Sequence, residues 1–149
     1  MTKVEVVNRQ RKRRVATAPL RTFLERAARA APAPGDATVT VCLISDRAMK
    51  GLNERWRGRA RTTDVLSFPA GDAPPFAGPT HMGDIAVSVE QAARQAAERG
   101  GGLPGELKRL VLHGWLHLLG YDHEADDGAM ARLERRLARR LLPHRRGRV

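Results

Sequence analysis

Residues 113–123 read HGWLHLLGYDH and contain three of the five histidines of this 149-residue chain. His113 and His117 are four residues apart, so on a helix their imidazoles lie on one face, one turn apart. Gly120 ends such a helix and lets the chain bring His123 back over that face. Three neutral imidazoles with one open position are the ligands of a catalytic zinc ion. The stretch therefore predicts one Zn²⁺ per chain, bound by His113, His117 and His123.

The same spacing constrains the chemistry of the predicted metal site. A bound cation can lower the pKa of a water to about 7 or polarise a phosphoryl oxygen. The three histidines and Gly120 match the extended H-E-x-x-H-x-x-G-x-x-H pattern of metzincin peptidases. Gly114 stands where those peptidases carry their glutamate general base, so the peptidase chemistry is incomplete. Three imidazoles also suit nickel, copper or iron, which leaves the physiological metal open.

The segments around this stretch predict four strands and about five helices. Alternating apolar residues indicate strands around Val4 and Val6 and over 38–45, 64–68 and 84–89. Helical periodicity and capping residues indicate helices over 19–31, 46–56, 89–99 and 103–119, and from 126 or 127 to 141. Only a loop separates the third and fourth strands, so a purely parallel sheet is not expected. We predict a single α/β (α+β) domain with a mixed four-stranded sheet.

Length and composition fit one domain over residues 1–149, with residues 143–149 as a basic tail. No apolar run approaches the roughly 20 residues of a membrane-spanning helix, and the first residues lack the apolar core of a signal peptide. Cys42 is the single cysteine, which allows no internal disulfide. We therefore expect a cytoplasmic protein with no membrane and no disulfide partner.

The charge of the chain favours phosphate-rich partners. Lys and Arg number 27 against 16 Asp and Glu, which gives a net charge of +11. Three basic clusters lie over residues 9–14, 55–61 and 132–148. A second explanation stays open, because a GC-rich genome also produces many arginines without selection for binding.

Three segments together resemble one known family. HGWLHLLGYDH, LNERWRGRARTTDVLSFP (52–69) and HMGDIAVSVEQAARQA (81–96) resemble, in family order, the motifs of the YbeY family of metal-dependent bacterial endoribonucleases. The match spans about residues 38–123. Trp56 stands where Tyr or Phe is common, and Arg59-Ala60-Arg61 differs from the Lys-Asp-Lys often found there.

The resemblance implies a zincin-like fold with the histidine helix at its centre. It implies a single-strand-specific, zinc-dependent endoribonuclease that acts in maturation of the 3′ end of 16S ribosomal RNA and in ribosome quality control. The implied partners are ribosomal RNA, the small ribosomal subunit and its assembly factors. His113 and His117 would then be catalytic residues as well as ligands. No general base is evident, so either a metal-bound water or the RNA 2′-hydroxyl could be the nucleophile.

The resemblance also marks Arg57 as a catalytic arginine. A guanidinium can grip a phosphate bidentately and stabilise charge that develops on it. The alternative is a solvated arginine that the dipole at a helix end stabilises. Arg55, Arg59 and Arg61 are candidate RNA-binding residues, either as non-specific phosphate contacts or simply as solvated charge.

Other residues allow two interpretations each. Asp84 could hydrogen-bond a ligand histidine and fix its tautomer, or simply stand at the start of a strand. Trp56 and Trp115 lie at helical spacing among apolar residues, which favours core positions over base-stacking ones. Cys42 lies in an apolar strand, which favours a buried, unreactive thiol.

Two functions compete with the nuclease. One is a non-catalytic ribosome-assembly factor that binds RNA and holds a structural metal, because the basic clusters fit it equally well. The other is a zinc peptidase, which the ligand spacing supports and Gly114 disfavours. Cleavage of RNA or of peptides by the metal-loaded protein distinguishes the three.

Overall fold

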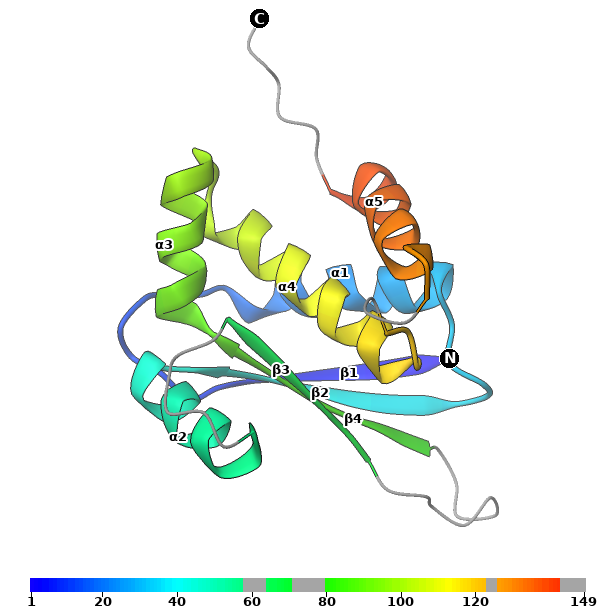
Figure 1. Ribbon diagram of the computed structural model, residues 1–149, viewed down its shortest axis with the longest axis horizontal. Coiled ribbons are helices and arrows are strands. Elements are labelled where there is room, and N and C mark those ends of the chain that lie inside the picture. The colour runs from blue at the N-terminus through cyan, green and yellow to red at the C-terminus, as the bar shows by residue number, and fades with distance from the viewer. Residues whose placement is uncertain (58–63, 71–79, 123–125, 143–149) are drawn as a thin grey trace, which may run out of the picture.

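The computed structural model describes residues 1–57, 64–70, 80–122 and 126–142, without the side chain of Arg57 (Figure 1). Four strands and five helices follow one another in these segments. In chain order they are β1 (Thr2–Asn8), α1 (Thr17–Ala30), β2 (Ala37–Ile44), α2 (Asp46–Arg57), β3 (Val65–Pro69), β4 (Thr80–Ser88), α3 (Val89–Arg99), α4 (Leu103–Leu118) and α5 (Ala129–Leu141).

The strands form one mixed sheet in the order β1-β2-β4-β3. β1 pairs with β2 and β2 with β4 in parallel, whereas β3 pairs with β4 antiparallel. The antiparallel pair is the two strands that only a loop separates. The predicted α+β class, the four-stranded mixed sheet and the five helices are therefore confirmed. β3 is an edge strand, and its outer edge is paired with no other described strand.

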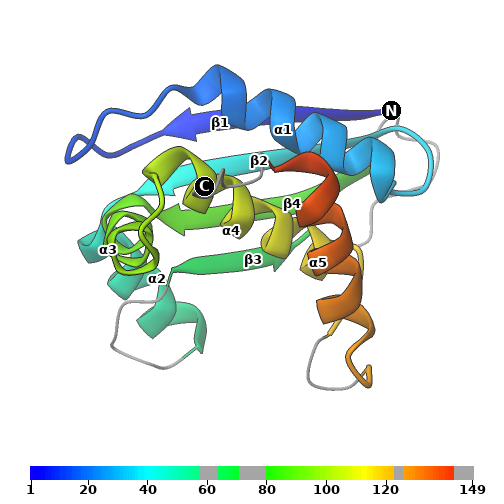
Figure 2. The ribbon, with the colours of Figure 1, turned by 90° about the horizontal axis from the view of Figure 1, so that it is seen from above.

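The helices lie on two sides of the sheet (Figures 1 and 2). α1 and α4 pack on one face over the main apolar core, and α5 crosses above both of them. α2 lies on the opposite face, over a small cluster of Ile44, Met49, Leu66 and Ala86. Trp115 of α4 is fully buried in the main core, and its Nε1–H donates to the backbone oxygen of Ala31 at 2.9 Å. Its predicted core position is confirmed.

Trp56 is not a core residue, so that prediction was wrong. The tryptophan is 68% exposed. Met49, two turns earlier in α2, is fully buried, and Leu52 is half-buried. The first turns of α2 therefore pack on the sheet, whereas its last turn extends past the sheet. Trp56 continues the apolar stripe of the helix but has no core beneath it.

β4 begins at Thr80, four residues before the predicted start. His81 pairs with Thr38 but Gly83 pairs with Val39, so Met82 is the extra residue of a bulge. A bulge interrupts the two-residue alternation from which a strand is recognised. Gly83 has a φ of +143°, a conformation that side chains disfavour. The strand is therefore visible in the sequence only after this point.

The helix ends follow the predicted capping signals in two cases. The Ser88 hydroxyl accepts a hydrogen bond from the Gln91 N–H at 3.3 Å at the start of α3, which confirms that cap. At the start of α5, the Asp126 carboxylate accepts from the Met130 N–H at 3.0 Å. α1 begins two residues before Pro19, and no side chain caps it.

No helix in the described segments is both long and apolar enough to cross a membrane.

The Cys42 thiol is expected to react slowly in the native protein. It is half-buried in β2, burial raises its pKa, and the negative charge of Asp84 raises the pKa further. Because the thiolate is the reactive form, a raised pKa lowers the rate at a given pH. Alkylation by iodoacetamide at pH 8 should be several-fold slower in the folded protein than in urea. Equal rates in the two states would contradict this account.

Candidate active site

The two histidines of α4 face each other across one helical turn. Nε2 of His113 lies 3.2 Å from Nε2 of His117, and the two rings meet edge to face with centroids 4.7 Å apart. Both rings are partly exposed, whereas Leu112, Trp115 and Leu116 on the other sides of the helix are buried. The packing of α4 on the sheet therefore fixes the helix so that two imidazole nitrogens converge on one point at the surface.

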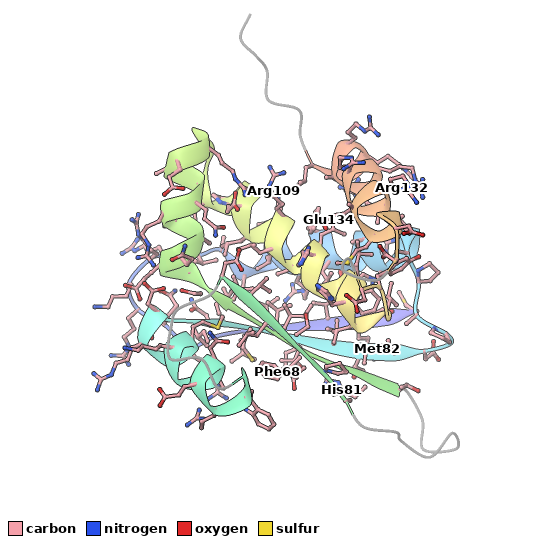
Figure 3. The ribbon with its side chains drawn as sticks, in the orientation of Figure 1. Phe68, His81, Met82, Arg109, Arg132 and Glu134 are labelled. Carbon is pink, nitrogen blue, oxygen red and sulfur yellow. The ribbon has the colours of Figure 1, made fainter. Side chains whose placement is uncertain are left out.

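Glu134 of α5 holds the first of these rings. Its Oε1 lies 2.9 Å from Nδ1 of His113, and Figure 3 shows Glu134 on the side of α5 that faces α4. The side chains of His113 and Glu134 are 30% and 23% exposed, so the contact is partly shielded from water. When Nδ1–H donates to this carboxylate, the lone pair of the neutral ring is on Nε2, which faces His117.

The same carboxylate changes the acidity of His113. The hydrogen bond to Glu134 raises the pKa of His113 above its ordinary value, while burial acts in the opposite direction. The negative charge of Asp64, just before β3, adds to the increase. The two carboxylates therefore make the electrostatic potential at the site negative, which favours a bound cation, either a proton or a metal ion.

The donor set fits a zinc ion. Two nitrogens bound at about 2.0–2.1 Å in tetrahedral geometry are separated by about 3.3–3.4 Å, close to the separation of the two Nε2 atoms. Carboxylates behind ligand histidines are common at such sites. Across the described segments, no group of three or more His, Cys, Asp or Glu side chains could hold a metal. His123, the third predicted ligand, lies outside the described residues.

Gly114 faces the sheet and not the histidine pair. A Cβ built on it would lie 2.7 Å from Cγ2 of Ile85 and 3.1 Å from the Ser67 hydroxyl. That hydroxyl donates to the backbone oxygen of Gly114 at 3.1 Å, which ties β3 to α4 beside His113. The close approach of helix and sheet leaves no room for the glutamate that peptidases carry here.

The described residues include only some of the predicted arginines. Arg57 is the last residue of α2, and its side chain is outside the described atoms. Arg55 is exposed on the same helix. Arg59 and Arg61 lie outside the described residues. The roles predicted for these four arginines therefore stay predictions.

The described contacts of Asp84 are with His81 and not with His113 or His117. Its Oδ1 lies 3.3 Å from Nε2 of His81, whose Nδ1 lies 2.8 Å from the Thr38 hydroxyl. Asp84 is paired with Phe68 in the sheet, and its side chain is 51% exposed. β4 directs Asp84 to the α2 face while α4 lies on the other, and the carboxylate behind His113 is Glu134. A contact of Asp84 with His123 stays a prediction, because His123 lies outside the described residues.

The sequence held a signal for Glu134 that the analysis of motifs missed. The apolar stripe of α5 includes Met130 and Leu137, and Glu134 falls on the same stripe, four residues after the first and three before the second. An acidic residue on the buried side of an amphipathic helix needs a partner. Its partner is His113.

Replacing Glu134 by glutamine should weaken zinc binding by roughly 10- to 100-fold, as expected when the group behind a ligand histidine is changed. The amide keeps the shape of the side chain but removes the charge that orients the ring. Competition with a zinc chelator measures the affinity. Glu98→Gln on the exposed face of α3 is the matched control and should leave it unchanged. Equal affinities in the two variants would show that Glu134 does not support a metal ligand.

Together, the mixed sheet and the central helix with its paired histidines define an α+β protein with a candidate cation-binding helix. The sequence profile described as Endoribonuclease YbeY matches residues 5–142. The chain belongs to the YbeY family.

Individual relatives agree with this assignment. A protein of Anaeromyxobacter sp. (strain Fw109-5) named Endoribonuclease YbeY is 48% identical over 106 residues, which are 70% of this chain and 54% of the relative. A protein of the same name from Chelativorans sp. (strain BNC1) is 44% identical over 130 residues, 82% of this chain and 79% of the relative. The chain spans about half the length of the Anaeromyxobacter relatives it matches.

A solved structure has the same fold. The solution structure of TM1509 from Thermotoga maritima matches with a TM-score of 0.63 and 30% identity. The match covers 95% of this chain and 89% of that one. The agreement extends over the sheet and the helices and is not limited to the histidine motif.

Proposed function

We propose that this chain is a zinc-dependent endoribonuclease that cleaves single-stranded RNA. The observation that carries the proposal is the pair of imidazole nitrogens, 3.2 Å apart, backed by the Glu134 carboxylate. The relatives named Endoribonuclease YbeY support the RNA substrate. A zinc ion, when bound, supplies a Lewis acid that can polarise a phosphoryl oxygen or acidify a water.

Several residues of the chain have separate roles in the proposed reaction. His113 and His117 hold the metal together with His123, and Glu134 keeps the proton of His113 on Nδ1 so that Nε2 stays available. Arg57 neutralises charge on the scissile phosphate. Gly114 lets α4 lie close to β3 and β4, which fixes the direction of both imidazoles. The attacking group, water or the RNA 2′-hydroxyl, determines whether the products carry 2′,3′-cyclic phosphates.

The exposed side of α5 offers a surface for the RNA backbone. Glu134 lies on the inner side of this helix, and the five arginines that share its outer side are exposed: Arg132, Arg135, Arg136, Arg139 and Arg140. Arg132, in the first turn of α5, is labelled in Figure 3. Arginines neutralise phosphates without reading sequence, and they would hold the strand beside the site. This binding should weaken with added salt.

The family resemblance supports a proposal for the physiological role. We propose that the substrate is the 3′ end of 16S ribosomal RNA and that the protein acts in ribosome quality control. Its partners would then be the small ribosomal subunit and assembly factors, and its location would be the cytoplasm.

A cleavage assay with four substrates tests this function. Zinc-loaded wild type and identically purified His117→Ala are incubated with a single-stranded RNA that carries the 16S 3′ end, the same sequence as a duplex, the DNA equivalent and a peptide. We expect wild type alone to cut the single-stranded RNA, with activity lost in chelator and restored by zinc. Equal cutting by both proteins would contradict the assignment of the site.

Two other outcomes would support the rival functions. Peptide turnover without RNA cleavage would identify a zinc peptidase. RNA binding by both proteins without cleavage, also in the presence of small ribosomal subunits, would identify an assembly factor that holds RNA and does not cut it.

A further inference from the structure

Trp56 is the one large aromatic side chain that the described residues leave mostly exposed, at 68%. Its ring lies edge to face against Phe68, with centroids 5.8 Å apart and an interplanar angle of 67°. Phe68 is the ring next to the indole, and most of the Trp56 surface stays open to solvent. Trp56 lies beside Leu52, Phe68 and Pro69, and a contiguous exposed apolar surface of this kind often marks a binding site.

The two rings belong to the wall of an open cavity. It has a volume of about 620 Å³ and is lined by Leu52, Trp56, Ser67, Phe68, Pro69 and Asp84. Figure 3 shows Phe68 on the side of the sheet that carries α2, whereas Glu134 lies on the other side. Among the described residues the lining is mostly apolar, and the one charged group in it is the Asp84 carboxylate. Because that carboxylate repels phosphate, the cavity suits a flat apolar group and not the backbone of a nucleic acid.

The cavity adjoins the histidine pair through one strand. Ser67 lines the cavity, and its hydroxyl donates to the backbone oxygen of Gly114, the residue after His113. β3 is the edge strand that lies between the two places. A polymer that crosses this edge would have one unit in the cavity and a later unit on the side of the sheet that carries the imidazoles. Trp56 is also followed directly by Arg57, the candidate phosphate-binding residue.

We propose that this cavity binds one unpaired nucleobase of the RNA substrate, stacked on the indole of Trp56. This inference rests on the proposed nuclease function and adds a base subsite to it. Every nucleobase has a π face, so stacking on an aromatic ring holds RNA with little sequence preference. A base within a duplex has both faces covered by its neighbours and cannot enter. The subsite therefore gives a physical reason for a preference for single strands.

Tryptophan fluorescence reports on this contact without any cleavage. The chain has two tryptophans, and Trp115 is fully buried, so a change in emission on RNA addition comes from Trp56. The full chain is kept in chelator so that RNA binds and is not cut. A short single-stranded RNA is titrated into wild type, Trp56→Phe and Trp56→Leu, with the same sequence as a duplex for comparison. Labelled RNA gives the affinity by anisotropy, and melting temperatures confirm that each variant is folded.

We expect single-stranded RNA to quench wild-type emission and the duplex to leave it nearly unchanged. Trp56→Leu should bind the single strand roughly tenfold more weakly, within the range that loss of one base–aromatic stack produces. Trp56→Phe keeps an aromatic face and should bind within about threefold of wild type. Unquenched emission together with equal affinities in all three proteins would overturn the proposal.

The failure of this proposal is distinguishable from the failure of the proposed function. Zinc-dependent cleavage with no contribution of Trp56 to binding would overturn the base subsite and leave the nuclease standing. Quenching that depends on Trp56, without cleavage by the zinc-loaded protein, would confirm the subsite in an RNA-binding protein that is not a nuclease. Absence of any RNA binding by wild type would overturn both.

Discussion

Replacing His117 by alanine should abolish zinc binding and, with it, RNA cleavage. The Nε2 atoms of His113 and His117 converge on one point, so removal of either ring leaves at most two of the three predicted ligands. Loss of the carboxylate behind a ligand weakens binding by roughly 10- to 100-fold, and loss of a ligand itself should exceed the upper end of that range. Competition with a chelator and single-turnover cleavage measure the two effects.

Thermal unfolding separates this effect from a general loss of structure. His117 is partly exposed and alanine favours helices, so the metal-free variant should melt close to the metal-free wild type. Zinc at 100 times its dissociation constant should stabilise wild type by about 2.7 kcal/mol and leave His117→Ala unchanged. The same increase in melting temperature in both proteins would show that zinc binds elsewhere.

Replacing Gly83 by alanine should destabilise the fold strongly. The new Cβ would lie 2.3 Å from the backbone oxygen of Phe68, 2.9 Å from Cδ2 of Leu118 and 3.0 Å from Cα of Pro69. The φ of +143° adds backbone strain of about 1–3 kcal/mol. Overpacking adds about 1–3 kcal/mol, so the free energy of unfolding should fall by about 2–6 kcal/mol in urea titrations.

Two further glycines isolate the causes of this loss. Gly100→Ala shares a positive φ of +70° but meets nothing within 4 Å, so it reports the strain alone. Gly51→Ala in α2 also meets nothing, has no positive φ and should stabilise by up to about 1 kcal/mol. If Gly83→Ala lowers the free energy of unfolding by no more than Gly100→Ala does, the contact of the β4 bulge with β3 and α4 is not as close as described.

The helical histidine pair was predictable because its chemistry is local. A spacing of four residues on a helix fixes the relative positions of His113 and His117 before any tertiary contact forms. Leu112, Trp115 and Leu116 are buried on the other sides of the same helix and hold it against the sheet. The adjacent third and fourth strands likewise predicted the one antiparallel pairing in the sheet.

The contacts that depend on distant segments were not predictable in this way. Glu134 reaches His113 from a helix 21 residues further along the chain, and motif spacing carries no information on such a pair. Asp84 could be predicted either to hydrogen-bond a ligand histidine or to start a strand, and only the folded sheet shows that β4 directs it to the α2 face. The exposure of Trp56 depends on where α2 extends past the sheet. The amphipathic pattern of the α2 sequence does not predict that position.

Zinc occupancy and RNA cleavage, measured in one titration, test the central claim most directly. Zinc is added stepwise to the metal-free protein, and the initial rate of cleavage of single-stranded RNA is followed together with the amount of bound zinc. The account predicts a rate that rises in proportion to bound zinc, saturates at one ion per chain and stays at background for His117→Ala. A rate that does not depend on zinc, or that rises equally in His117→Ala, would contradict it.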